Sequence, residues 1–117
     1  MGLVVYKVSP RLAWEQAARS RQFEGSDNDH RDGFIHLSSA AQVPGTLVKH
    51  FAGQPDLLLV AIDAEALGAA LRWEPSASGT LYPHLYGPLP IDAVLEVTAL
   101  PITARGRHVL PEGFAQC

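Results

Sequence analysis

The sequence predicts a single α+β domain with a mixed or antiparallel sheet and two main helices. Its 117 residues match the usual size of one domain, and 47% of them are hydrophobic, which is enough to form a core. Segments typical of strands and helices alternate in the first half, whereas the later strands are not separated by full-length helices. We place the domain at residues 1–101. Hydrophobic density falls after Pro101, so residues 102–117 are expected to form a loosely held tail.

The first strand and helix are predicted from residues 3–20. Residues 3–8 (LVVYKV) are β-branched and aromatic, as is typical of a strand. Ser9 is expected to cap a helix over residues 10–20, with Pro10 at its first position. The helix is expected to bury four side chains: Leu12, Ala13, Trp14 and Ala17. Residues 21–33 hold two glycines and four acidic side chains, which predicts a solvated loop.

Residues 34–38 (FIHLS) predict a short strand with an unusual polar face. Side chains alternate along a strand, so Phe34, His36 and Ser38 share one face. Ser39 and Gln42 match a capping box, which predicts a second helix to about Phe51, and Pro44 should distort its first turn.

The second half predicts a buried central strand followed by shorter elements. Residues 56–63 (DLLLVAID) form a continuous apolar run, which is typical of a strand covered on both faces. A short helical turn at residues 64–67 should end at Gly68, and strands are expected at residues 71–74 and 94–97. Residues 81–90 contain three prolines, which favours a rigid, irregular connection over a regular central strand.

Composition excludes several classes of function. The net charge is −3 and the nine Lys and Arg residues are scattered, so binding to a nucleic-acid backbone is not expected. The sequence contains neither a secretory leader nor an apolar run approaching ~18 residues, which predicts a cytoplasmic protein without a membrane partner. Cys117 is the only cysteine, so no disulfide within the chain is expected. A monomer or a small homo-oligomer is expected.

Seven polar or amphipathic side chains stand in apolar surroundings and form the predicted ligand site: Lys7, His36, Ser38, Trp73, Glu74, His84 and Tyr86. The face shared by His36 and Ser38 suits a heterocyclic ligand. His84 and Tyr86 lie in the proline-rich segment, which would hold them in place at little entropic cost. His36, Glu74 and His84 are the candidates for catalysis.

Each of these residues also has a structural interpretation. His36 could be half-buried and bonded to a backbone carbonyl, Ser38 could cap a helix, and Glu74 could face solvent. Tyr86 could bridge core and water. A metal site formed by His36, His84 and Glu74 is a further alternative. The sequence has no H-x-H or H-x-x-x-H pair, so no metal is expected.

Several strings resemble a family of small bacterial proteins known as domain of unknown function 952. They are Asp32 to Ser38 (DGFIHLS), Leu71 to Glu74 (LRWE) and Pro83 to Gly87 (PHLYG), supported by Tyr6 to Val8, Gln42, and His50 with Phe51. The resemblance extends over about residues 4–101.

The order of elements is also distantly similar to the ADP-ribosyltransferase-like fold. This similarity implies NAD as a substrate and an ADP-ribosyltransferase-like or phosphotransferase-like activity. It places His36 and Ser38 on the second motif of the pocket, and Lys7 near the first. Enzymes of this fold commonly carry a glutamate on a late strand, but residues 81–86 contain no acid, so Glu74 would have to reach in from the preceding strand.

Two functions therefore remain open from the sequence. One is binding of NAD or an ADP-ribose-like nucleotide, with or without turnover. The other is a non-catalytic regulatory or protein-interaction module in which Trp73, Tyr86 and the prolines form the contact surface.

Overall fold

The computed structural model describes residues 3–111 and residue 114. Cys117 and the first two residues lie outside the described residues. The helices and strands follow in this order: β1 (Val4–Pro10), α1 (Arg11–Ser20), β2 (Gln22–Phe23), α2 (Asp27–Asp32), β3 (Ile35–His36), α3 (Val43–His50), β4 (Leu57–Asp63), α4 (Ala64–Leu67), β5 (Leu71–Pro75), β6 (Leu81–Leu85), β7 (Leu89–Pro90) and β8 (Val94–Leu100). Short 3-10 turns lie at Ala40–Gln42, Gly68–Ala70 and Ile91–Ala93. The sheets are antiparallel, so the predicted α+β class is confirmed.

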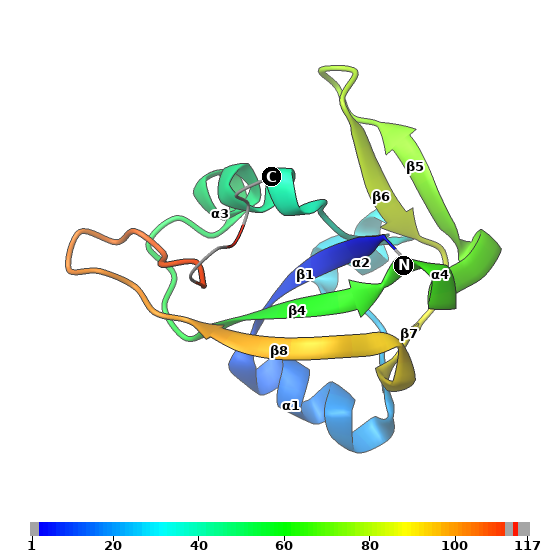
Figure 1. The fold of residues 1–117 in the computed structure, drawn as a ribbon, viewed down its shortest axis with the longest axis horizontal. Coiled ribbons are helices and arrows are strands. Elements are labelled where there is room, and N and C mark those ends of the chain that lie inside the picture. Colours follow the sequence, from blue (N-terminus) through cyan, green and yellow to red (C-terminus); the bar gives the residue numbers. More distant parts are fainter. Residues whose placement is uncertain (1–2, 112–113, 115–117) are drawn as a thin grey trace.

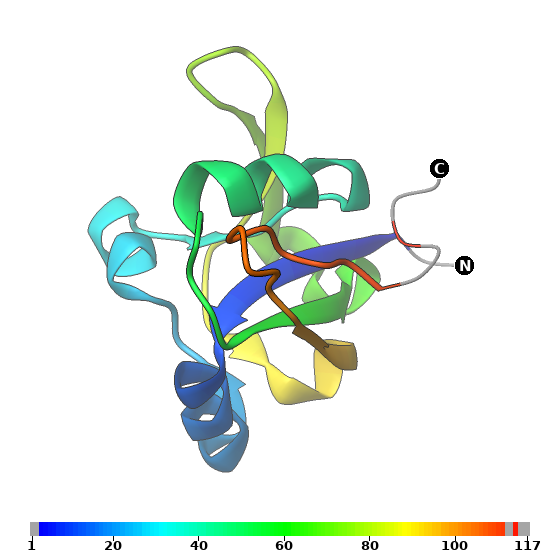
Figure 2. The same ribbon diagram turned by 90° about the vertical axis from the view of Figure 1, so that its left-hand side faces the viewer.

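The largest sheet has the strand order β1-β4-β8 and is covered on both faces (Figure 1). Leu58, Val60 and Ile62 of β4 pack in one hydrophobic cluster with Trp14 of α1. Leu57 and Leu59 point the other way and pack in a second cluster with residues of α3. The two main helices thus lie on opposite sides of this sheet (Figure 2). The prediction of a central strand buried on both faces is confirmed.

A second sheet, β3-β6-β5, meets the first at a backbone bridge between Tyr6 and Ser38. The Tyr6 N–H donates to the Ser38 carbonyl at 2.7 Å, and the Ser38 N–H donates to the Tyr6 carbonyl at 2.8 Å. The β5–β6 hairpin projects from the body at the upper right of Figure 1. The bridge thus brings β1 of the first sheet beside the end of β3 in the second.

The expectation for residues 81–90 was wrong, because β6 is the middle strand of the second sheet. Pro83 lies within it, buried and opposite Trp73. The Pro83 carbonyl accepts from the Leu37 N–H at 3.0 Å. N–H and C=O of one residue point to the same side of a strand, so the missing N–H of Pro83 removes no bond to β5.

The prediction of a solvated loop at residues 21–33 was also wrong. This segment contains β2, which pairs with β7, and the helix α2. Ser26 and Asp29 form a capping box: the Ser26 N–H donates to Asp29 Oδ2 at 2.8 Å, and the Asp29 N–H donates to Ser26 Oγ at 3.4 Å. Gly33 ends the helix in the left-handed conformation with φ 85°, where glycine is the favoured residue. The charged segment is therefore folded, and one of its acidic side chains, Asp29, is buried.

The start of the first helix differs from the expectation in two respects. Pro10 ends β1 and precedes α1, and the Ser9 hydroxyl donates to the Pro10 carbonyl rather than capping the helix. Leu12 is 65% exposed, whereas Trp14 and Ala17 are buried as predicted. At the second helix the Ser39 N–H donates to Gln42 Oε1 at 2.9 Å, and a 3-10 turn precedes α3, as the position of Pro44 predicts.

The chain beyond β8 turns back on itself and contacts the body. Ile102 and His108 pair, and the Phe114 ring meets the Tyr6 ring edge to face at a centroid distance of 5.0 Å. Within the part of the chain that the structure describes, no helix has the length and apolar character needed to cross a membrane.

Candidate functional site

A surface cavity of about 400 Å³ lies where the two sheets meet α2 and α3. Its wall draws on β1, α2, the segment from His36 to Ser38, α3, the turn at residues 76–78 and β6. This volume is within the usual range for small-molecule sites. The cavity is thus assembled from segments that are far apart in the sequence.

The cavity lining is rich in hydroxyl groups and carries an excess of positive charge. Its hydroxyl-bearing residues are Tyr6, Ser26, Ser38, Thr46, Ser76, Ser78 and Tyr82. The cations Lys7, Arg31 and Lys49 outnumber the carboxylates Asp29 and Asp32 by one. Such a lining suits a polar ligand that carries an anionic group.

A buried charge network forms the floor of the site. Lys7 Nζ lies 3.1 Å from Asp29 Oδ2, and it also donates to the His36 carbonyl at 3.1 Å. Side-chain exposure is only 8% for Lys7 and 2% for Asp29. Burial lowers the pKa of the Lys7 ammonium, against the opposing effect of Asp29. The Lys7 ammonium is therefore bound by Asp29 and by the His36 carbonyl within the protein.

Asp29 fixes the orientation of His36. The Asp29 Oδ1 atom lies 2.7 Å from His36 Nδ1 and accepts from the His36 backbone N–H at 3.1 Å. Burial acts to raise the pKa of the Asp29 carboxyl, but the hydrogen bond from His36 and the charge of Lys7 hold it well below its usual range. The carboxylate thus keeps its charge at neutral pH and holds the imidazole in one position.

The second nitrogen of His36 also faces a carboxylate. His36 Nε2 lies 2.9 Å from Asp32 Oδ2, and Asp32 in turn pairs with Arg31 at 3.2 Å. The hydrogen bond from Arg31 and, less strongly, that from His36 lower the pKa of Asp32. Donors and acceptors match at both contacts when both ring nitrogens carry hydrogen.

Ser38 and Thr46 join the strand segment to α3 across the cavity wall. Their hydroxyl oxygens lie 2.9 Å apart, and Ser38 is buried. Ser38 and His36 thus line the same cavity, but Phe34, which was expected on the same face, does not, and β3 itself contains only Ile35–His36.

His84 is held by a separate arrangement on the neighbouring strand. Its ring stacks on Phe34 at a centroid distance of 3.9 Å and an angle of 23°. His84 Nδ1 lies 2.8 Å from Glu74 Oε1, and the Tyr86 hydroxyl donates to the same oxygen at 2.7 Å. The hydrogen bonds from His84 and Tyr86 lower the pKa of Glu74, and the carboxylate raises the pKa of Tyr86.

The two imidazoles face one cavity from paired positions. His36 and His84 are direct partners in the β3–β6 register, and their ring centroids are 5.8 Å apart. Both residues line the cavity, together with Lys7 and Ser38.

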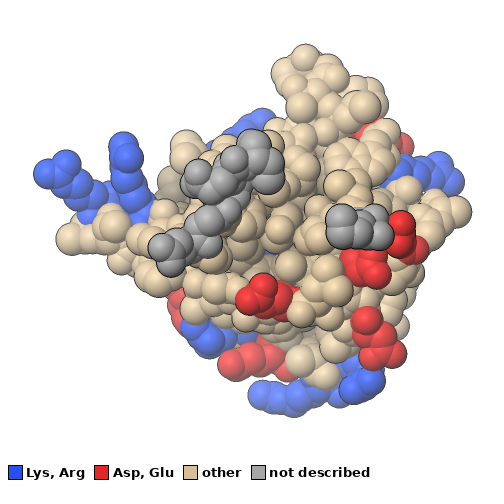
Figure 3. Space-filling model, in the orientation of Figure 1, with Lys and Arg blue, Asp and Glu red and all other residues tan. Residues whose placement is uncertain are grey.

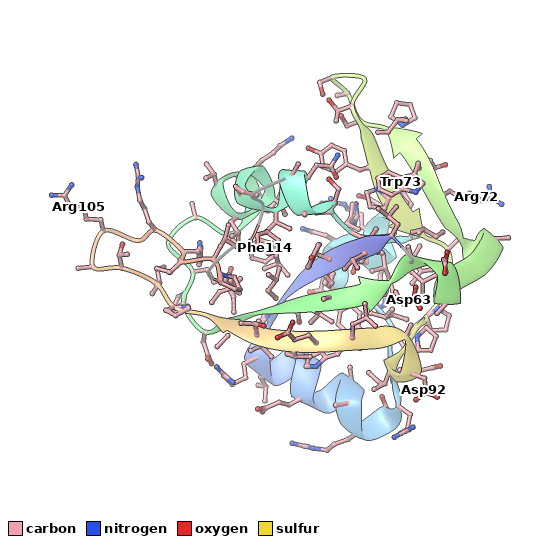
Figure 4. The ribbon with its side chains drawn as sticks, viewed as in Figure 1. Asp63, Arg72, Trp73, Asp92, Arg105 and Phe114 are labelled. Atoms are coloured by element: carbon pink, nitrogen blue, oxygen red, sulfur yellow. The ribbon has the colours of Figure 1, made fainter. Side chains whose placement is uncertain are left out.

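Three of the predicted ligand residues lie elsewhere. Glu74 contacts His84 Nδ1, the Tyr86 hydroxyl contacts Glu74, and both residues are outside the cavity lining. Trp73 is 38% exposed on β5 and also lies outside it (Figure 4). Among the described residues, no group of three His, Cys, Asp or Glu side chains is arranged to hold a metal ion.

Sequence reasoning missed Asp29, Asp32, Thr46 and Lys49. Residues 21–33 were expected to be solvated because of their charge density. One signal could have identified Asp29: Ser26 and Asp29 have the S-x-x-D spacing of a capping box, which predicts a helix start rather than a loop. Nothing in the local pattern indicates that the Asp29 side chain would be covered by Lys7 of β1.

The face shown in Figure 3 carries its basic side chains as separate groups around the edges. A continuous basic stripe is what a phosphate-backbone binder requires, and this face does not have one.

Comparison with known proteins defines the class of this cleft-bearing α+β domain. The model of the family described as protein of unknown function (DUF952) matches residues 8–97. The chain belongs to this family, which confirms the resemblance found in the sequence.

A solved relative has the same fold. The chain is similar to the crystal structure of protein CC0527 from Caulobacter crescentus, with 42% identity and a TM-score of 0.86 over 91% of this chain and 93% of that one. A crystal structure of a double mutant of CC0527 gives the same values. The solution NMR structure of CC0527 gives 44% identity and a TM-score of 0.79 over 88% and 89% of the two chains. No curated protein matches the chain.

Proposed function

We propose that the protein binds NAD or an ADP-ribose-like nucleotide in the cavity beside His36. The observation that carries this proposal is the chemistry of one continuous lining, in which cations, hydroxyl groups and flat rings face the same space. A nucleotide presents the matching set of phosphate, ribose hydroxyl groups and heterocycle.

Lys49 is the natural partner for a phosphate group. It is exposed, it lines the cavity, and it has no ion-pair partner among the described residues. Lys7 and Arg31, by contrast, are already paired with carboxylates. A charge-assisted hydrogen bond from Lys49 to phosphate therefore requires no internal pair to break.

The rings of Tyr82 and His84 supply surfaces for a heterocycle. Both lie on β6 and line the cavity, and His84 is held by its stack on Phe34. A ring that is already fixed loses little entropy when a ligand stacks on it. The positions of His36 and Ser38 in the same wall agree with the distant similarity to the ADP-ribosyltransferase-like fold.

The carboxylate expected of transferases in that fold has no direct counterpart in the lining. Glu74 points to His84 instead, and Asp29 and Asp32 are engaged by cations and by His36. The proposal is therefore one of ligand binding, and transfer of ADP-ribose is not part of it.

Calorimetric titration with NAD, ADP-ribose and nicotinamide tests the proposal. We expect binding of NAD and ADP-ribose, and a loss of affinity of about ten-fold in Lys49→Gln, since a charged hydrogen bond to phosphate is lost. Arg105→Gln is the matched control, because it removes the same charge from a residue that points away from the body (Figure 4). Equal weakening by both substitutions would show that net charge, and not the cavity, decides affinity.

Flat traces for all three ligands would reject nucleotide binding and favour the second candidate, a protein-interaction module. The observation behind that candidate is the exposure of apolar side chains on the β5–β6 hairpin and directly after it. Trp73 is 38% exposed, Leu81 51% and Tyr86 39%. Exposed aromatic residues of this kind are common in protein contact surfaces.

A further inference from the structure

We infer that His84 is a general base for hydrolysis of the bound nucleotide's phosphoanhydride bond, with Glu74 as its positioning residue. This inference rests on the proposed nucleotide binding and adds a reaction to it.

The geometry leaves one nitrogen of His84 available. Nδ1 is directed at Glu74, which lies outside the cavity lining, whereas His84 is one of the residues that line the cavity. Nε2 has no hydrogen-bond partner among the described residues. A carboxylate on Nδ1 fixes the tautomer in which Nε2 accepts a proton, which is the arrangement that a catalytic base needs.

Two direct contacts and one indirect contact hold this imidazole in place. Phe34 stacks against its face, Glu74 binds one edge, and the Tyr86 hydroxyl holds the Glu74 carboxylate through the same oxygen. The His84 side chain is 13% exposed, so it is largely shielded but still reachable from the cavity. The ring is thus preorganised without a contact from any ligand.

His36 is a poor candidate for the same role. Both of its ring nitrogens already face carboxylates, Asp29 at 2.7 Å and Asp32 at 2.9 Å. Neither nitrogen is left to accept a proton from water unless one of these contacts breaks. The assignment of the base to His84 follows from this difference.

The reaction balances with water as the only co-reactant. His84 Nε2 takes a proton from water as the water oxygen forms a bond to one phosphorus of the pyrophosphate. The bond from that phosphorus to the bridging oxygen breaks, and its electron pair leaves with the other phosphate. ADP-ribose would thus give AMP and ribose 5-phosphate, and Nε2 would return its proton to solvent.

The charge of the cavity favours attack at phosphorus over cleavage of a glycosidic bond. Lys49 is available to stabilise the negative charge that develops on the phosphoryl oxygens. An oxocarbenium-like centre would instead need a carboxylate, and both carboxylates in the lining are engaged: Asp29 by Lys7 and His36, and Asp32 by Arg31 and His36.

The test measures binding and turnover separately on the full chain. Calorimetry with ADP-ribose reports binding, and chromatographic detection of AMP in ¹⁸O-labelled water reports turnover and the site of attack. We expect His84→Asn to weaken ADP-ribose binding by about ten-fold, because a ring on which the heterocycle stacks is lost, and to lower turnover at saturating ADP-ribose by about 100-fold or more. Asparagine can still donate to Glu74 but has no basic nitrogen. His108→Asn is the control, because His108 lies outside the cavity lining and bonds to the Gln54 carbonyl.

Glu74→Gln separates positioning from structure. We expect kcat to fall by about ten-fold and KM to stay within about three-fold, because the amide of glutamine holds Nδ1–H of His84 less firmly and the base is less well oriented. A purely structural role would lower the unfolding midpoint and leave kcat per folded molecule unchanged.

Each outcome decides one of the two proposals. Binding of ADP-ribose without release of AMP by the wild type would overturn the inference and leave nucleotide binding intact. Full activity in His84→Asn would overturn the assignment of the base. Absence of binding would reject the proposed function itself and the reaction with it.

Discussion

His36 and His84 are paired in the same register, yet their surroundings differ. The His36 ring has a carboxylate at each nitrogen, and behind one of them lies the buried Lys7–Asp29 pair. The His84 ring has a carboxylate at one nitrogen only and is otherwise held by stacking on Phe34. The first arrangement uses every polar atom of the ring to join α2, β1 and β3, whereas the second leaves one nitrogen for a ligand.

Proximity to a cavity does not by itself define the chemical role of a histidine. His36 carries the more specific sequence string, D-G-F-I-H-L-S, and it lines the cavity. Its hydrogen bonds, however, give it a structural role, because they join β3 to Asp29 and Asp32 of α2. Substitutions in only one network at a time therefore test whether the network around His36 supports stability and the network around His84 supports function.

The largest effect on stability is expected from Asp29→Asn. This change removes the negative charge that compensates the buried Lys7 ammonium, and removal of one member of a buried ion pair commonly costs about 3–5 kcal/mol. Urea unfolding followed by circular dichroism measures the loss. Asp27→Asn is the control, since Asp27 lies on the same helix but is exposed. Equal losses in both variants would show that the charge of α2 matters and the buried contact does not.

The contribution of the same network to the stability of the wild-type protein should be lost at acid pH. The pKa of Asp29 is lower in the folded chain than its usual unfolded value, so its contribution to stability is complete above about pH 4. As the pH falls through the unfolded and then the folded pKa, that contribution is lost, on the order of 2 kcal/mol. Unfolding free energies measured from pH 6 to pH 2 should therefore fall more steeply in the wild type than in Asp29→Asn. Parallel curves would contradict this origin of the acid sensitivity.

Lys7→Met should cost less than Asp29→Asn. Methionine retains the apolar stem, and Asp29 still accepts from the Ser26 N–H and from the ring and backbone of His36. We expect a loss of about 1–2 kcal/mol in urea unfolding, in the range for removal of one charged hydrogen-bond partner. A loss larger than that of Asp29→Asn would mean that Lys7 holds the sheet through contacts other than this pair.

The smallest effect on stability is expected from Glu74→Gln. The Glu74 side chain is 34% exposed and its contacts lie at the edge of the second sheet. The unfolding midpoint should stay within experimental error, while ¹⁵N resonances of the His84 ring should show a changed tautomer balance, because a neutral amide holds Nδ1–H less firmly. Unchanged ring resonances would show that Phe34, and not Glu74, sets the state of His84.

Local sequence patterns predict several strands and helices of this protein and part of the cavity wall. The apolar run of β4 predicts a strand covered on both faces, the spacing of Val43 and Leu47 predicts α3, and period-two alternation places His36 and Ser38 in one wall. These features depend on neighbours a few residues away, so the sequence alone carries them. The D-G-F-I-H-L-S and P-H-L-Y-G strings likewise indicated the family that the match over residues 8–97 confirms.

Which charges are buried, and which strand is central, depends on contacts between segments that are far apart in the sequence. In the sequence, Asp29 is one of four acidic residues in a polar segment. Its burial depends on a contact with Lys7, which lies 22 residues earlier in the chain. Pro83 argues against a central strand, and it is accommodated because its carbonyl and its nitrogen face the segment after β3. Both outcomes depend on the desolvation and backbone hydrogen bonding of groups far apart in sequence, which exist only after the two sheets have met.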